Sequence, residues 1–170
     1  MFRILFICHG NICRSPMAEF VMKDLVERSG LSDLFEIASA ATSRDEIYRD
    51  RNGRDVGSPV YPPARKKLAE HGIDCGSKTA RQLTKDDYGR WDLLVCMDQW
   101  NIRNTLRIVG SDPDGKVCAL LDLASRPGEE VADPWYTGDF EATWQDVIAG
   151  CHGLLQKLTS KTGAEQPGTD

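Results

Sequence analysis

The chain has 170 residues and a formal net charge of -5 at pH 7, from 26 acidic and 21 basic residues. This length suits one α/β domain with its own core, and the acidic balance argues against a general nucleic-acid-binding surface. The apolar stretches are too short to span a bilayer, and Met1 leads directly into "FRILFIC" without a cleavage site. We therefore predict a cytoplasmic protein with no nucleic-acid and no membrane partner.

The six cysteines and three histidines form no metal-binding pattern. No pair of cysteines has CxxC spacing and the histidines do not cluster. A chain of this length without a secretion signal favours reduced thiols over disulfides. We predict no metal and no cofactor, with most cysteines acting as small buried hydrophobic residues.

Apolar strand patterns alternate with helical patterns along the chain. The predicted strands cover 2–8, 35–40, 92–98 and 116–124, and the predicted helices cover 16–28, 62–73, 83–91, 99–109 and 139–158. Such alternation predicts a doubly wound parallel sheet with helices on both faces. We predict one domain over 1–159 and a disordered polar tail over 160–170.

One segment interrupts this alternation. Residues 43–64, "SRDEIYRDRNGRDVGSPVYPPA", read as a long polar loop with charges of both signs. It is either a solvated surface loop or a rim that contacts substrate.

The turn after the first strand, "CHGNICRS" over 8–15, joins a thiol, a guanidinium and a hydroxyl. A phosphoryl group carries about two negative charges and needs converging donors. Consecutive loop N–H groups supply them, with Gly10 allowing a tight turn. Ser15 followed by Pro16 suits the start of a helix, with Ser15 as its N-cap. Arg14 offers a planar fork for two phosphate oxygens.

The same groups favour the thiolate form of Cys8 over the thiol. A thiolate can attack phosphorus to form a phosphocysteine intermediate, which water then hydrolyses. Ser15 can donate to this sulfur, and Asn11 can fix the loop through its side chain. The bland alternative is a buried cysteine beside a surface arginine. The nucleotide-binding pattern GxxxxGK[ST] does not occur.

The string "CHGNICRSPMAEF" resembles the signature of the low-molecular-weight protein tyrosine phosphatases. The likeness continues through "SAATS", "LAEHGI", "KTARQLT", "VCMDQWNIR" and "DPWYTGDFEATWQDV" in the same order. The resemblance implies a cytosolic, metal-free enzyme with a four-stranded parallel sheet in the order 2-1-3-4. It implies phosphotyrosine proteins as substrates, and phosphate or another oxyanion as the ligand of the active site.

The resemblance also assigns roles. Cys8 would be the nucleophile, Arg14 would bind the phosphoryl group and Asp133 would be the general acid. Ser39 and His71 would hold Asn11 from behind. The phosphate-binding loop would consist of His9, Gly10, Asn11, Ile12, Cys13, Arg14 and Ser15.

The acid role of Asp133 also has a physical basis. A tyrosyl group leaves more easily when a carboxylic acid protonates it. Trp135 and Tyr136 follow closely and would form a substrate rim that packs on the aryl ring. Asp98, just past the third strand, is open to two interpretations, a residue that orients the site or a helix N-cap.

Three features remain open in the sequence. Cys13 either forms a reversible disulfide with Cys8, as the resemblance implies, or packs beneath the loop. His9 departs from the usual apolar or small residue of the family, and it either faces the pocket or lies on its rim. The loop at 43–61 looks expanded by about a dozen residues relative to the family, and Tyr48 in it is a candidate for stacking on the substrate ring.

Two related activities and one inactive class compete with this prediction. Thioredoxin-coupled arsenate reductases need two cysteines seven apart, whereas Arg103 stands seven positions after Cys96. Protein arginine phosphatases tend to carry threonine where this chain has Ile12. A catalytically dead phosphate-binding module is disfavoured because nucleophile, arginine and acid are all present.

Overall fold

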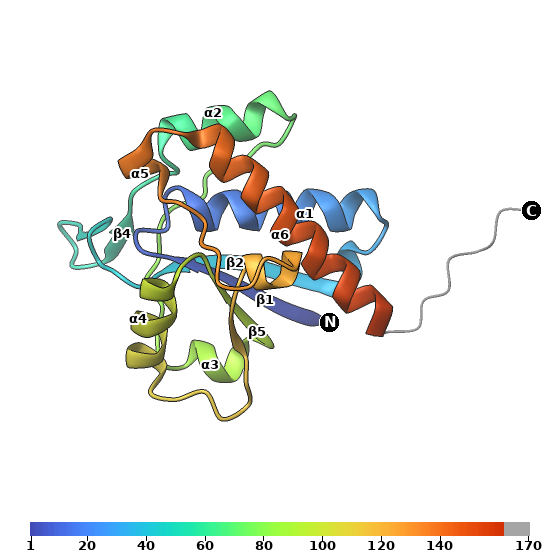
Figure 1. The fold of residues 1–170 in the computed structure, drawn as a ribbon. Helices are drawn as coiled ribbons and strands as arrows, with labels where there is room; N and C mark the ends of the chain where they lie inside the picture. Colours follow the sequence, from blue (N-terminus) through green and yellow to red (C-terminus); the bar gives the residue numbers. More distant parts are fainter. Residues whose placement is uncertain (162–170) are drawn as a thin grey trace, which may run out of the picture.

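The computed structural model describes residues 1–161, which fold around a four-stranded parallel sheet (Figure 1). The strand order is β2-β1-β5-β6, which confirms the predicted 2-1-3-4 order once the four sheet strands are numbered consecutively. The strands are β1 (Phe2–Cys8), β2 (Phe35–Ala41), β5 (Leu93–Cys96) and β6 (Val117–Ala119). Within residues 1–161, no helix is long and apolar enough to cross a membrane.

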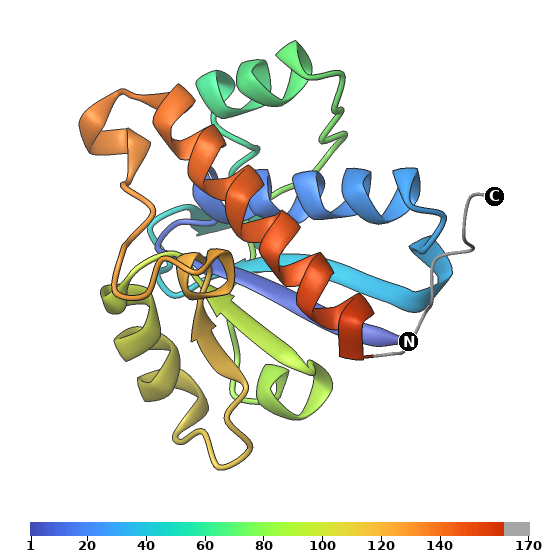
Figure 2. The same cartoon turned by 45° about the vertical axis from the view of Figure 1, so that its right-hand side comes forward.

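Helices cover both faces of the sheet (Figures 1 and 2). Side chains from alternate positions of β1 enter opposite cores: Ile4 and Phe6 pack with α1 and α6, whereas Leu5 and Ile7 pack on the face of α3 and α4. Both faces of β1 are therefore buried, as its continuous apolar sequence predicts. The helices are α1 (Arg14–Arg28), α2 (Pro62–Glu70), α3 (Asp87–Arg90), α4 (Gln99–Val109), α5 (Pro134–Thr137) and α6 (Phe140–Lys161).

The predicted strand over 116–124 is wrong in its second half. β6 ends at Ala119, and the 3-10 turn η2 (Leu121–Ala124) follows it against α6. Two glycines of α6 make this close approach possible. A Cβ on Gly150 would lie 2.3 Å from Leu120 Cγ, and one on Gly153 would lie 2.1 Å from the Leu123 carbonyl oxygen.

The final helix is longer than predicted. α6 continues through residues 160 and 161, which the sequence placed in a disordered tail. The rest of that predicted tail lies outside the described residues. The 3-10 turn η1 (Ser32–Leu34) and the short helix α5 were not predicted.

The segment at 43–64 is more ordered than the predicted loop. It contains an antiparallel hairpin of β3 (Ile47–Arg49) and β4 (Asp55–Gly57). The end of the hairpin packs on the backbone near Ala80, where the Ala80 N–H donates to the Ser58 carbonyl at 2.9 Å. Gly57 is required for this contact, because an added Cβ would lie 1.8 Å from the Ala80 carbonyl oxygen.

Candidate active site

The loop after β1 wraps around the sulfur of Cys8. The Asn11 N–H donates to Cys8 Sγ at 3.3 Å, and Ser15 Oγ lies 3.0 Å from the same sulfur. Asn11 Nδ2 donates to Ser15 Oγ at 2.9 Å. The Ser15 hydroxyl thereby accepts from the asparagine, and its own hydrogen can point at the sulfur. The loop places two donors around an atom that is most useful as an anion.

Asn11 supplies the left-handed turn of the loop, with φ at 59°. Asparagine tolerates this conformation better than most residues. The sequence assigned the tight turn to Gly10, but Gly10 has ordinary backbone geometry and a Cβ there would make only ordinary contacts. The N-cap predicted for Ser15 is also wrong. α1 already begins at Arg14, so Ser15 lies in the first turn and faces back toward Cys8.

Buried polar groups hold Asn11 in place. Its Nδ2 also donates to Ser39 Oγ at 2.8 Å, and its Oδ1 accepts from the Arg81 backbone N–H at 3.1 Å. The Ser39 hydroxyl donates to the buried Glu19 carboxylate, and Lys78 Nζ lies 3.4 Å from that carboxylate. Burial lowers the pKa of Lys78, and the Glu19 charge opposes this shift. The support predicted for Ser39 is present in the structure.

The support predicted for His71 is not present. His71 is exposed and its ring stacks on Trp144, with ring centroids 3.8 Å apart. It follows α2 at a position where the side chain reaches α6 and not the phosphate loop. The sequence missed Glu19, Lys78 and Arg81 because their roles depend on tertiary contacts between distant segments.

Arg14 is 3% exposed and is held from two sides. Its Nη1 donates to Asp98 at 2.6 Å and to the Val131 carbonyl at 3.0 Å, while its Nη2 donates to Asp133 at 3.3 Å. Burial opposes the charge of Arg14, but the Cys8 sulfur and the two carboxylates outweigh it and raise its pKa. The guanidinium is thus a fixed cation.

Asp98 fulfils both of its predicted alternatives. One carboxylate oxygen caps α4 by accepting from the Asn101 N–H at 2.7 Å, and the other binds Arg14. Asp133 has a similar arrangement as N-cap of α5, where it accepts from the Trp135 N–H at 3.1 Å. Both carboxylates are fixed by the start of a helix and directed at one guanidinium.

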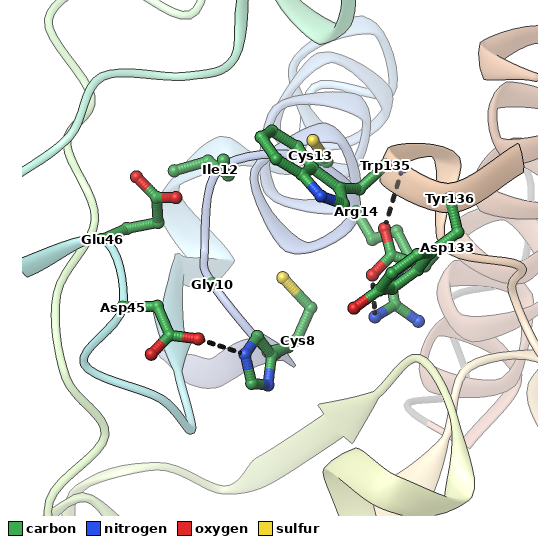
Figure 3. Close-up of a pocket in the computed structure, with 11 residues that line it drawn as sticks. Cys8, Gly10, Ile12, Cys13, Arg14, Asp45, Glu46, Asp133, Trp135 and Tyr136 are labelled. Atoms are coloured by element: carbon green, nitrogen blue, oxygen red, sulfur yellow. Dashed lines mark hydrogen bonds and ion pairs between the residues drawn. The ribbon is translucent and has the colours of Figure 1, made fainter. Parts of the chain in front are cut away.

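A cavity of about 260 Å³ opens above Cys8 (Figure 3). On one side stand Asp133, Trp135 and Tyr136, and on the other stand Asp45 and Glu46. The complete lining is Cys8, His9, Gly10, Ile12, Cys13, Arg14, Asp45, Glu46, Asp133, Trp135 and Tyr136. Most of the predicted site residues therefore meet in one place.

Tyr48 lies outside this lining. It is on β3, 58% exposed, and paired with Val56 across the hairpin, so its role on the rim stays a prediction. His9 lines the cavity, and its Nε2 lies 2.7 Å from an Asp45 carboxylate oxygen. The sequence did not single out Asp45 or Glu46. Their position two and three residues after "SAATS" is a signal, because β2 ends beside the phosphate loop.

A second cavity, of about 460 Å³, adjoins the first on the side of α4. It shares four residues with the first cavity and adds Asp98, Trp100, Asn101 and Asn104; the shared residues are His9, Arg14, Asp133 and Tyr136. The active-site cleft is therefore open toward the N-terminal end of α4.

Cys13 and Cys96 are both buried thiols. Burial, together with the charges of Cys8 and Asp133, raises the pKa of Cys13 to about 12. Cys96 is fully buried on β5, with its sulfur 3.5 Å from Thr105 Oγ1, so it cannot serve as an accessible redox thiol. No cluster of three or more potential metal ligands occurs among residues 1–161.

A strand, a phosphate loop and a helix, with cysteine, arginine and aspartate converging on one cavity, define the class of cysteine-dependent phosphomonoesterases. The sequence model of the low molecular weight phosphotyrosine protein phosphatases matches residues 3–164. The chain belongs to this family.

Individual relatives agree. The chain is 33% identical to the low molecular weight protein-tyrosine-phosphatase YfkJ of Bacillus subtilis, covering 93% of this chain and 96% of the relative. It is 35% identical to the human low molecular weight phosphotyrosine protein phosphatase, covering 91% and 94%. The crystal structure of YfkJ superposes with a TM-score of 0.85 at 31% identity, covering 95% of this chain and 96% of that chain.

Proposed function

We propose that this protein hydrolyses phosphotyrosine in proteins through a phosphocysteine intermediate, with Cys8 as nucleophile, Arg14 as phosphoryl-binding residue and Asp133 as general acid. The observation that carries the proposal is the meeting of the Cys8 sulfur, the Arg14 guanidinium and the Asp133 carboxylate in one cavity. Membership of the phosphatase family supports it. We further propose a cytoplasmic location.

In the first step the Cys8 thiolate attacks phosphorus, and the bond from phosphorus to the tyrosyl oxygen breaks. Protonated Asp133 gives its proton to the departing oxygen, so tyrosine leaves neutral. In the second step Asp133 takes a proton from water, the water oxygen attacks phosphorus, and the phosphorus–sulfur bond breaks. Phosphate leaves and the thiolate is restored, stabilised by the Ser15 hydroxyl and the Asn11 N–H.

The two terminal nitrogens of Arg14 have different roles. Nη1 is anchored at 2.6 Å by Asp98, whereas Nη2 makes only the 3.3 Å contact with Asp133. A phosphoryl dianion is a stronger competitor for Nη2 than one carboxylate. We infer that phosphate binding displaces Asp133 from Arg14 and turns the acid toward the leaving group, while Asp98 keeps the guanidinium in position.

The test is hydrolysis of p-nitrophenyl phosphate and of a phosphotyrosine peptide in the presence of EDTA. We expect turnover by the wild type and a loss of about 10⁴-fold or more in Cys8→Ser, because a hydroxyl is a far weaker nucleophile than a thiolate. Cys118→Ser, on β6 away from the cavity lining, is the matched control. Substantial activity in Cys8→Ser would refute the mechanism.

We also propose that Cys13 protects Cys8 from irreversible oxidation. A Cys8 sulfenic acid would condense with the Cys13 thiol, releasing water and forming a disulfide that a reductant reopens. Both residues line the cavity. The raised pKa of Cys13 keeps it a thiol at neutral pH, so trapping depends on its position beside Cys8 and not on a high thiolate fraction. After peroxide treatment, dithiothreitol should restore activity to the wild type but not to Cys13→Ser.

A further inference from the structure

The cavity above Cys8 is lined by more negative than positive charge. Three carboxylates line it, and Arg14 is the single guanidinium among the lining residues. Arg14 and Asp133 already pair with each other. Asp45 and Glu46 stand on the opposite side of the cavity (Figure 3). An enzyme that needs only to bind a phosphate dianion gains nothing from two carboxylates there.

The carboxylate of Glu46 is available for a ligand. Glu46 is half-buried and its Cγ packs beside Gly10, 3.4 Å from the position of a Cβ there. Within residues 1–161 its carboxylate has no hydrogen bond or ion pair. Arg44, two positions earlier in the chain, binds Asp55 at 2.9 Å. A partly desolvated carboxylate without a partner favours a cation.

Asp45 extends this acidic wall outward. It is more exposed than Glu46 and is held by His9 at 2.7 Å. The hydrogen bond from His9 helps to lower the pKa of Asp45, so the carboxylate stays ionised. Glu46 next to the phosphate loop and Asp45 at the rim form a short anionic track that leads away from Cys8.

We propose that Glu46 and Asp45 select substrates in which a lysine or arginine lies next to the phosphotyrosine. The inference rests on the proposed phosphotyrosine phosphatase function. The aryl ring would pack on the side of Trp135 and Tyr136, and the neighbouring basic side chain would reach the acidic wall across the cavity. An acidic neighbour would meet the same wall with like charge.

The test compares two phosphotyrosine peptides that differ only in the residues flanking the phosphotyrosine, lysine in one and glutamate in the other. We expect wild-type kcat/KM to be about five- to tenfold higher for the lysine peptide at low salt, since partly exposed pairs have modest energies. The preference should shrink at about 0.5 M salt through screening.

Three variants locate the effect. Glu46→Gln should reduce the preference to within about twofold, and Glu46→Lys should reverse it. Glu27→Gln makes the same chemical change at an exposed position near the far end of α1 and should leave the preference unchanged. Hydrolysis of p-nitrophenyl phosphate, which has no flanking residues, should stay within about twofold in Glu27→Gln.

The possible failures are distinguishable. Equal kcat/KM for the two peptides in the wild type would overturn the inference and leave the phosphatase function intact. An equal loss for both peptides in Glu46→Gln would also overturn it, because it would assign Glu46 a merely structural role. No turnover of either peptide or of p-nitrophenyl phosphate would refute the proposed function itself.

Discussion

The phosphate loop at 8–15 and the segment at 43–57 lie next to each other and both line the cavity, but they are built differently. In the loop, Asn11, Arg14 and Ser15 are buried and hydrogen-bonded to groups in fixed positions. In the segment at 43–57 most charged side chains are exposed and pair with one another. Buried polar groups lose more when a partner is removed than exposed ones do. The side chains of the phosphate loop are therefore held rigidly, whereas the wall formed by residues 43–57 is free to change.

Replacing Arg14 should cause the largest loss of activity. Arg14→Lys keeps the charge but removes the fork that binds Asp98, Val131 and Asp133. We expect kcat/KM for p-nitrophenyl phosphate to fall by about 10³-fold, the scale of losing a donor that stabilises transition-state charge. Steady-state kinetics measure this loss. A decrease of less than tenfold would mean that the guanidinium geometry is unimportant.

Replacing Asp133 tests its role as general acid. Asp133→Ala should lower kcat/KM for phenyl phosphate, a poor leaving group, by about 10²–10³-fold. The loss for p-nitrophenyl phosphate should be smaller, because this phenolate leaves without a proton. Rates for a series of aryl phosphates measure the dependence on the leaving group. An equal loss for all of them would remove Asp133 from the acid role.

Asn11→Ala tests the support behind the loop. It leaves Ser39 and the Arg81 N–H without their partner and places alanine at a positive φ. We expect kcat/KM to fall about five- to thirtyfold, since about 1–2 kcal/mol of positioning is lost. Asn11→Asp should lose more, because an ionised carboxylate cannot make the two Nδ2 donations and adds negative charge beside Cys8. Full activity in Asn11→Ala would show that the loop holds its shape without this network.

Asp87, behind the loop, should matter through stability. It is 6% exposed and binds Arg81, Thr84 and Trp91. Burial raises its pKa, but these hydrogen bonds outweigh that effect and lower it. Its contribution is therefore present above the unfolded pKa of about 3.9 and lost as pH falls through the folded value. Urea unfolding of Asp87→Asn at pH 7 should show a loss of about 1–2 kcal/mol, discounted for partial solvation.

Asp50 is the matched control on the hairpin. Its pKa is also lowered by hydrogen bonds, chiefly from Arg54, but its side chain is 21% exposed, compared with 7% for Asp87. Asp50→Asn should lower the urea midpoint at pH 7 by less than Asp87→Asn does, because solvent screens the Asp50 carboxylate more. A loss equal to that of Asp87→Asn would contradict the contrast between the buried network behind the phosphate loop and the exposed charges of the hairpin.

Shortening the hairpin should have the smallest effect. Replacing residues 50–54 with Asn-Gly joins β3 and β4 by a two-residue turn that suits antiparallel strands. Asp45 and Glu46 are retained, so hydrolysis of p-nitrophenyl phosphate should stay within about twofold. A loss above tenfold would make the hairpin tip part of the catalytic machinery.

The residue pattern was enough to predict a parallel sheet and a loop that gathers Cys8, Arg14 and Ser15, because β1 and this loop are local in sequence. The strand order and the place of Asp133 in the site came from the family resemblance, since they join segments far apart in the chain. Contacts between distant segments were less accessible. His71 was misplaced, and Glu19, Arg81 and Glu46 were missed, because only the folded chain shows which side chains reach the loop. The hairpin was missed because its charged strands carry little hydrophobic alternation.

The close packing of α6 on η2 also has an evolutionary consequence. The chain that carries Asp133 enters α6, and α6 reaches its place only because Gly150 and Gly153 lack side chains. A Gly150→Ala change, usually regarded as favourable in a helix, would push the helix away from Leu120 and with it the segment that positions the acid. Gly150 and Gly153 are therefore constrained during evolution although neither lines the cavity. Substitution at either position is expected to reduce activity.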